Sequence, residues 1–159
     1  ADAPVAEIRE LIRPLGMEHK KSERLKRLAR TLVDKYGGQV PRDKTALLSL
    51  PGVGRYTANA VLCLGYGLDA LMLDASALRV LKRVFGIKSA RARPRDDEAV
   101  WMAYEEVVPR GKSREFNLAV LDFAALVCTA KNPRCNDCVV ADICASRGEQ
   151  GPKVQQEIW

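Results

Sequence analysis

The chain has 159 residues, of which 47% are hydrophobic and 29% are charged, a balance typical of a folded globular protein. No apolar stretch approaches the roughly 20 residues that a membrane-spanning helix needs, and the first residues lack a signal-peptide pattern, so we expect a soluble intracellular protein. The net charge of +6 is compatible with a polyanionic partner, because lysine and arginine can replace the counterions condensed on phosphates.

Most of the chain shows the periodicity of amphipathic helices. Apolar residues recur at helical spacing over 22–36, and Gly37 and Gly38 end this run. Six basic side chains lie between Lys20 and Arg30 on the same predicted helix. Because the other face of this helix is apolar, we interpret these charges as a solvated face.

A helical pair with a tight turn follows. Asp43 is placed to cap a short helix that ends at Leu50. Residues 51–54 then form a Pro-Gly-Val-Gly turn, and a second helix is predicted over about 55–65. The apolar stretch 68–73 lacks the alternation of a strand, so we predict a connector there.

Three more helices are predicted in the second half. The first follows Asp74 and ends at Gly86. A basic loop over 88–95 comes next, after which Asp96 is placed to cap the second helix, and the third runs over about 113–127. The side chains expected to face the core are Leu78, Leu81 and Phe85 in the first helix and Val100, Trp101, Tyr104, Val107 and Val108 in the second. The fold is therefore predicted to be all-α.

Four of the five cysteines are clustered near the end of the chain, at positions Cys128, Cys135, Cys138 and Cys144. Disulfide scaffolds spread their cysteines over secreted chains, so clustered thiolates in an intracellular protein indicate a metal site. One short Cys-x2-Cys pair with two longer arms favours a four-thiolate iron–sulfur cubane, with zinc as the alternative. The fifth cysteine, Cys63, lies between two leucines and is expected to be a buried small hydrophobe.

Two basic residues, Lys131 and Arg134, lie inside the first arm of this cysteine loop. A bound cluster would hold the loop in place, and these charges would then be able to face phosphate groups. The alternative is that they are ordinary solvated loop charges, and the sequence favours neither interpretation.

The hairpin between the first two short helices has the sequence Leu-Pro-Gly-Val-Gly-Arg-Tyr-Thr-Ala, over 50–58. Its two glycines allow a sharp turn and leave no Cβ between the backbone amides and an approaching phosphate. These amides also begin a helix, so the positive end of the helix dipole points the same way. We expect phosphate binding that reads no bases, rather than a plain helical turn. The residues expected to bind DNA here are Leu50, Gly52, Val53, Gly54, Arg55 and Thr57.

Asp74 follows three apolar residues and stands at a predicted helix start. The simple interpretation is that its carboxylate caps the helix. The same position also suits catalysis, because a helix N-terminus favours an ionised carboxylate. Such a carboxylate can stabilise an oxocarbenium-like sugar and orient a water toward C1′. Both interpretations stay open on the sequence alone.

The hairpin, the aspartate that follows it and the cysteine spacing together resemble the endonuclease III-type family of helix-hairpin-helix DNA glycosylases. The resemblance runs from about Leu15 to Cys144. It implies two helical lobes with DNA between them and a flipped base in the cleft. It also implies phosphate binding by residues 52–54, catalysis by Asp74 and a [4Fe–4S] cluster on the four cysteines, with a monovalent cation at the hairpin as a further candidate ligand.

Tyr56 stands where the bifunctional members of this family carry a lysine that attacks the sugar and then cleaves the strand. A tyrosine cannot form a Schiff base, so the resemblance implies hydrolysis with water as the nucleophile. Tyr56 recurs in thymine/uracil mismatch glycosylases and in some MutY-type adenine glycosylases, and both the segment 117–123 and Asp74-Ala75 are more similar to the mismatch branch. We expect excision of thymine or uracil opposite guanine. The alternatives are excision of adenine opposite 8-oxoguanine and a non-catalytic DNA-binding iron–sulfur module.

The chain departs from the family in two ways. Ser76 stands where most relatives have Asn or His, and the chain starts inside the first lobe of the family, so we expect an incomplete apolar core. The expected division is a partial hairpin lobe over 15–90, a cluster lobe formed by 1–14 and 91–147, and a tail over 148–159. The expected protein is a monomer that acts on double-stranded DNA, in the prokaryotic cytoplasm or in a eukaryotic nucleus or mitochondrion.

Overall fold

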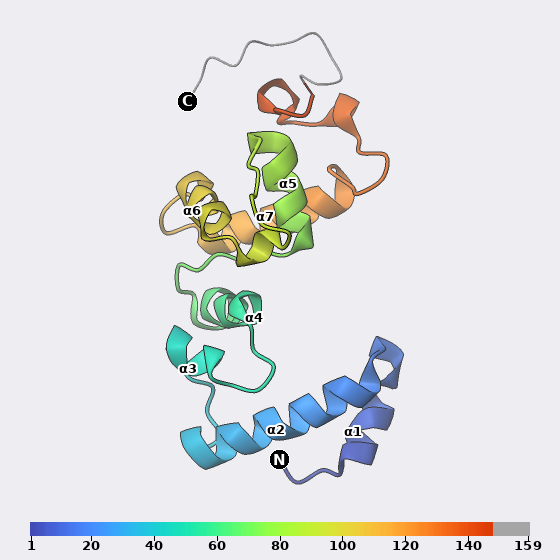
Figure 1. Cartoon of the computed structure of the whole chain (residues 1–159), viewed down its shortest axis with the longest axis vertical. Coiled ribbons are helices and arrows are strands. Elements are labelled where there is room, and N and C mark those ends of the chain that lie inside the picture. Colours follow the sequence, from blue (N-terminus) through green and yellow to red (C-terminus); the bar gives the residue numbers. More distant parts are fainter. Residues whose placement is uncertain (148–159) are drawn as a thin grey trace. The chain divides into compact units, whose positions relative to one another are not determined.

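The computed structural model describes residues 1–147, so the predicted tail over 148–159 lies outside the described residues. Within residues 1–147 all regular structure is helical, which confirms the predicted fold class (Figure 1). None of the described helices combines the length and the apolar character that a membrane span requires. The chain divides into two compact units, with the boundary between Tyr66 and Gly67. The lobe boundaries expected from the family stay a prediction.

The first unit begins with two packed helices. α1 (Val5–Ile12) is followed by a 3₁₀ turn, η1 (Arg13–Leu15), and then packs against α2 (Glu18–Tyr36), as Figure 1 shows. α2 starts earlier than the apolar periodicity predicts, because its polar first turn carries no apolar signal. It ends at Gly37, as predicted, where the backbone takes a φ of 59° that glycine adopts without strain.

The hairpin helices follow in the same unit. They are α3 (Lys44–Leu48) and α4 (Arg55–Ala60), and α4 continues into a π-helical turn, η2 (Val61–Gly65). The Asp43 carboxylate caps α3 as predicted, because its Oδ2 accepts a hydrogen bond from the Ala46 N–H at 2.7 Å. The π turn is marked by the hydrogen bond from the Tyr66 N–H to the Val61 carbonyl, and apolar periodicity does not predict it.

The hairpin helices and the turn carry five buried apolar residues. They are Leu47, Leu50, Ala58, Leu62 and Cys63. Cys63 is 0% exposed, which confirms the prediction that it is a buried small side chain. α3 and α4 also contact each other directly.

The second unit contains three helices around one core. They are α5 (Ala75–Phe85), α6 (Glu98–Val107) and α7 (Ser113–Leu126), and α5 crosses α7 (Figure 1). Short 3₁₀ turns lie outside this core, and they are η3 (Pro94–Asp96), η4 (Cys135–Asp137) and η5 (Ala141–Ile143). The buried core is formed by Leu73, Ala77, Val80, Leu81, Val84, Val100, Trp101, Tyr104, Val120, Ala124 and Cys128. As predicted, the segment before Asp74 is an irregular connector.

Two details of the predicted helices are wrong. Asp97 caps α6 in place of Asp96, because Asp96 still belongs to η3, and the Asp97 Oδ1 accepts from the Ala99 N–H at 3.2 Å. In α5, Phe85 is 41% exposed, since the buried stripe runs instead through Ala77, Val80, Leu81 and Val84 at spacings of three and four residues.

The connector that leads to Asp74 is held by one side chain of α7. Asn117 is 1% exposed, and its Oδ1 accepts hydrogen bonds from the Met72 N–H at 3.1 Å and from the Tyr104 hydroxyl at 3.0 Å. The Asn117 Nδ2 donates to the Ala70 carbonyl at 2.8 Å. Because the connector has no helical or sheet hydrogen bonds of its own, these bonds satisfy backbone groups that folding would otherwise leave without partners.

The variant Asn117→Leu should therefore destabilise the second unit strongly. It keeps a similar volume but removes the partner of the buried Met72 N–H and of the half-buried Ala70 carbonyl, which costs about 2–4 kcal/mol of unfolding free energy. Urea unfolding followed by circular dichroism measures this loss. The control is Leu118→Gln, because Leu118 is 41% exposed. An Asn117→Leu protein as stable as the control would contradict the role assigned to Asn117.

Candidate functional site

The turn of the hairpin is closed by a backbone hydrogen bond and is open at Gly54. The Val53 N–H donates to the Leu50 carbonyl at 3.1 Å, and Gly52 takes a φ of 79°, which only glycine adopts readily. Gly54 is the N-cap residue of α4, and no side chain caps this helix. A Cβ at Gly54 would meet no atom within 4 Å, so the start of α4 faces open space. The turn thus has the form that phosphate binding requires, while the binding itself stays a prediction.

The hairpin residues predicted to bind DNA differ in exposure. Leu50 is 4% exposed, so its side chain belongs to the core and only its backbone is placed for contact. Gly52, Gly54 and Thr57 are exposed, whereas Val53 and Arg55 are half-buried. Tyr56, the residue in place of the strand-cleaving lysine, is 36% exposed in the first turn of α4.

Asp74 stands at the start of α5 in the second unit. Its Oδ1 accepts from the Ala77 N–H at 2.7 Å, which confirms the predicted N-cap. The residues before it, Met72 and Leu73, are 3% and 0% exposed, and Asp74 itself is half-buried. Its Oδ2 accepts no hydrogen bond from any residue within 1–147. The helix therefore holds one carboxylate oxygen and leaves the other available to a water or a sugar.

A second carboxylate anchors the beginning of the connector. Asp69 accepts hydrogen bonds from the Ser113 hydroxyl at 2.7 Å and from the Gly111 N–H at 2.8 Å. These two bonds, with that of Ser113 the stronger cause, lower the pKa of Asp69. The Ser113 hydroxyl also accepts from the Ala70 N–H at 3.2 Å. The first turn of α7 thus fixes the chain that leads to Asp74.

Two arginines of α5 hold the segment where the cysteines begin. Arg79 donates through Nε to the Cys128 carbonyl and through Nη2 to the Ala124 carbonyl, both at 3.0 Å. Arg83 donates through Nη1 to the Thr129 carbonyl at 2.7 Å and contacts the Cys128 Sγ at 3.6 Å. Guanidinium groups suit this task because several of their N–H donors lie in one plane.

The other end of the cysteine segment is tied to the same helix. The Ala145 N–H donates to the Val84 carbonyl at 2.9 Å, and the Ser146 N–H donates to the Arg83 carbonyl at 2.8 Å. α5 therefore has Asp74 as its N-cap and binds both ends of the cysteine segment along its later turns.

The four clustered cysteines have a donor set that fits an iron–sulfur cluster. All four are free thiols, and Cys128 is buried, Cys138 and Cys144 are half-buried and Cys135 is exposed. Among the described residues no three His, Cys, Asp or Glu side chains lie close enough together to hold a single metal ion. Four cysteine thiolates are the donor set that a [4Fe–4S] cluster takes.

Comparison with protein families identifies both motifs. The helix-hairpin-helix motif matches residues 35–64, and the iron-sulfur binding domain of endonuclease III matches residues 128–144. A solved thermostable thymine-DNA glycosylase superposes with a TM-score of 0.85 at 41% identity, over 92% of this chain and 67% of that structure. The chain belongs to the endonuclease III-type family of helix-hairpin-helix DNA glycosylases.

Two further comparisons place the chain within this glycosylase family. The thymine/uracil-DNA glycosylase of Pyrobaculum aerophilum is 49% identical over 89% of this chain. The chain spans 63% of the length of that relative. A trapped endonuclease III–DNA covalent intermediate superposes with a TM-score of 0.81 at 30% identity, over 93% of this chain and 68% of that structure.

Sequence reasoning missed the residues that support the glycosylase motifs. Arg79 and Arg83 are four residues apart, so they share a face of the predicted helix, and this spacing is the signal that was available. No such signal marks Asp69, Ser113 or the hydrogen-bonding role of Asn117. Their hydrogen bonds join residues that lie more than forty positions apart in the sequence.

The lowered pKa of Asp69 predicts a pH-dependent effect of Asp69→Asn. The carboxylate stabilises the fold above its unfolded-state pKa, about 4, and this contribution is lost as the pH falls through the lower folded-state pKa. Asp69→Asn should therefore be less stable than the parent at neutral pH, and the difference should shrink in acid. Urea midpoints at several pH values measure it. The control is Asp122→Asn, because Asp122 is exposed. A stability difference between the parent and Asp69→Asn that grows in acid would contradict the assignment.

Proposed function

We propose that this chain belongs to a monofunctional DNA glycosylase that excises thymine or uracil opposite guanine from double-stranded DNA. The reaction is hydrolysis of the bond between the base and C1′ of the deoxyribose, the first step of base excision repair. The similarity to a thymine/uracil-DNA glycosylase at 49% identity supports this substrate class.

The available oxygen of Asp74 is the observation that carries this proposal. As the base leaves, C1′ develops oxocarbenium character, and a fixed carboxylate oxygen stabilises that positive charge. The same oxygen accepts a proton from a water that attacks C1′, so water becomes the nucleophile. Because Oδ1 is held by the Ala77 N–H, the side chain is already oriented and its ordering costs nothing during the reaction.

Tyr56 limits the reaction to base removal. A lysine amine would attack C1′ and form a Schiff base that leads to strand cleavage, whereas a phenol forms no such adduct. The product of this chain is therefore an intact strand with an abasic site.

The DNA backbone is the proposed ligand of the hairpin and of the cysteine loop. Residues 52–54 present amides to one phosphate, and the exposed cations Lys131 and Arg134 suit contacts with others. These contacts position the protein and carry no base specificity. A monovalent cation at the hairpin stays a prediction.

The proposed cofactor is a [4Fe–4S] cluster held by Cys128, Cys135, Cys138 and Cys144. When bound, the cluster links the cysteine segment covalently and can exchange an electron. The chain itself supplies the support: Arg79 and Arg83 hold the backbone where the segment begins, and α5 holds its end.

The variant Asp74→Asn tests the catalytic role. Asparagine keeps a side-chain oxygen for the N-cap but lacks the charge, so base release from a G·T or G·U duplex should fall about 100-fold or more. Hot alkali cleavage of a labelled oligonucleotide measures it. Asp43→Asn is the matched control, because Asp43 also caps a helix.

Undiminished release by Asp74→Asn would refute the assignment. The same panel carries an adenine opposite 8-oxoguanine, and preference for that duplex would move the enzyme to the adenine branch. Salt-sensitive binding without release from any duplex would identify a non-catalytic DNA-binding module.

Metal analysis tests the cofactor. The purified chain should hold about four iron and four acid-labile sulfide atoms, with broad absorbance in the visible range. Cys135→Ser should lose most of this absorbance, while Cys63→Ala should keep it, because Cys63 is buried in the other unit. Stoichiometric zinc in place of iron would contradict the proposal.

A further inference from the structure

Arg24 of α2 lies against the hairpin turn, although it is far from the hairpin in the sequence. A Cβ built on Gly52 would come within 3.3 Å of the Arg24 Cδ and within 3.7 Å of its Cβ and Cγ. The whole aliphatic stem of Arg24 therefore runs along the turn. The guanidinium begins one bond beyond Cδ, so it is carried by a stem that is packed against Gly52. Both residues belong to the first unit.

The helical neighbours of Arg24 do not neutralise this charge. Lys20, Lys21 and Arg27 occupy positions three and four residues away, where a carboxylate would stabilise an arginine. Within residues 1–147 no carboxylate forms an ion pair with Arg24, which is exposed. Like charges at this spacing destabilise a helix unless an anion binds to them.

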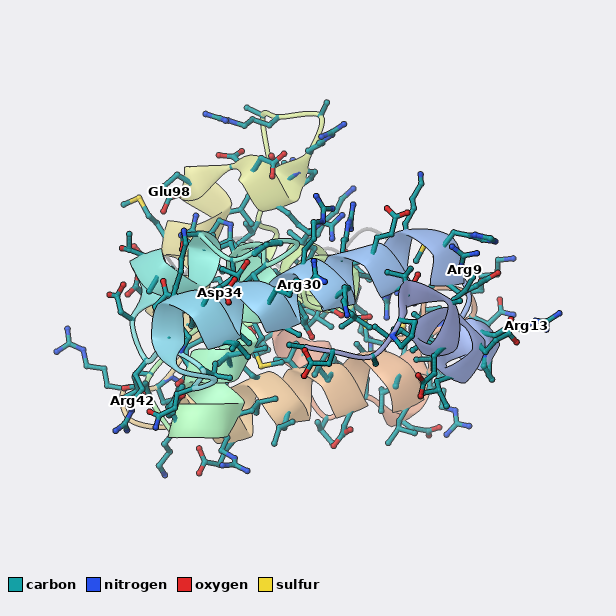
Figure 2. All side chains as sticks on the ribbon, turned by 90° about the horizontal axis from the view of Figure 1, so that it is seen from below. Arg9, Arg13, Arg30, Asp34, Arg42 and Glu98 are labelled. Carbon is teal, nitrogen blue, oxygen red and sulfur yellow. The ribbon has the colours of Figure 1, made fainter. Side chains whose placement is uncertain are left out.

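Two other basic side chains of α2 bind backbone carbonyls near the start of the chain. The Lys21 Nζ donates to the Leu15 carbonyl at 3.1 Å, and the Lys26 Nζ donates to the Ala3 carbonyl at 2.6 Å. These two lysines hold the N-terminal part of the chain. Arg30 is exposed on α2, where Figure 2 labels it. Arg24 provides all three of the atoms that lie nearest to a Cβ built on Gly52, and it is itself exposed.

We propose that Arg24 binds a DNA backbone phosphate next to the hairpin, as a contact that lies outside the matched hairpin motif. The inference rests on the proposed function, since it requires that the hairpin binds DNA. The stem packs on Gly52 and so restricts the side chain before DNA arrives, which lowers the ordering cost of binding. A guanidinium also matches phosphate geometry with two parallel donors, which a lysine does not provide.

The test separates the charge of Arg24 from the packing of its stem. Arg24→Met keeps an unbranched stem against Gly52 and removes the charge, and Arg30→Met is the matched control on the same helix. The probe is a fluorescein-labelled duplex oligonucleotide without a mismatch, titrated with the full chain at several salt concentrations. Each phosphate contact contributes about 0.9 to the slope of log K against log salt concentration.

We expect Arg24→Met to lower the magnitude of this slope by about 0.9 and Arg30→Met to leave it unchanged. Arg24→Lys should keep the slope, because it keeps the charge. Thermal unfolding of each variant checks the fold, and if Arg24→Met is unfolded the comparison is repeated with Arg24→Gln.

Two results would overturn the inference alone. One is an unchanged slope in folded Arg24→Met, which would leave Arg24 a packing residue only. The other is an equal decrease of the salt slope in Arg24→Met and Arg30→Met. This would indicate that the total positive charge of α2 attracts DNA without a specific contact from Arg24. A parent protein that shows no salt-dependent binding at all would overturn the proposed DNA binding and this inference with it.

Discussion

The second unit depends on the hydrogen bonds that Asn117 and Ser113 make to the connector before Asp74. This connector has neither helix nor strand, so its peptide groups need partners from elsewhere in the fold. Asn117 supplies both a donor and an acceptor from a fully buried position, and Ser113 links the Ala70 N–H to Asp69. The place of Asp74 is therefore determined by α7, an element that is distant in the sequence.

α5 connects this ordered segment to both parts of the candidate site, which are Asp74 and the cysteine segment. The connector sets where α5 begins. Asp74 caps the helix through Oδ1, and its Oδ2 stays available. Arg79 and Arg83 follow on the same helix and hold the start of the cysteine segment. A single rigid element thus supports the proposed catalytic group and the proposed cofactor ligands, which agrees with the general need to place reacting groups on well-packed structure.

The features that sequence could predict are those with local causes. The turn at Gly52, the cap at Asp43 and the end of α2 at Gly37 each depend on a few neighbouring residues. The π-helical turn of η2 and the replacement of Asp96 by Asp97 as a cap depend on how segments fit into the packed unit, so periodicity does not reveal them. The same limit applies to the candidate site: Asp74 is visible as a carboxylate at a helix start, whereas the support from Asn117 appears only in three dimensions.

The attachment of the cysteine segment at both ends has a consequence for the conformational entropy of that segment. Since residues near Cys128 and at Ala145 are bound to α5, hydrogen bonds to this helix close the chain between them into a loop. Closing a loop is the main entropic cost of gathering distant ligands, and here folding of the polypeptide has met that cost. The four cysteines therefore lie on one loop whose span is set by α5 rather than by the length of the chain that joins them.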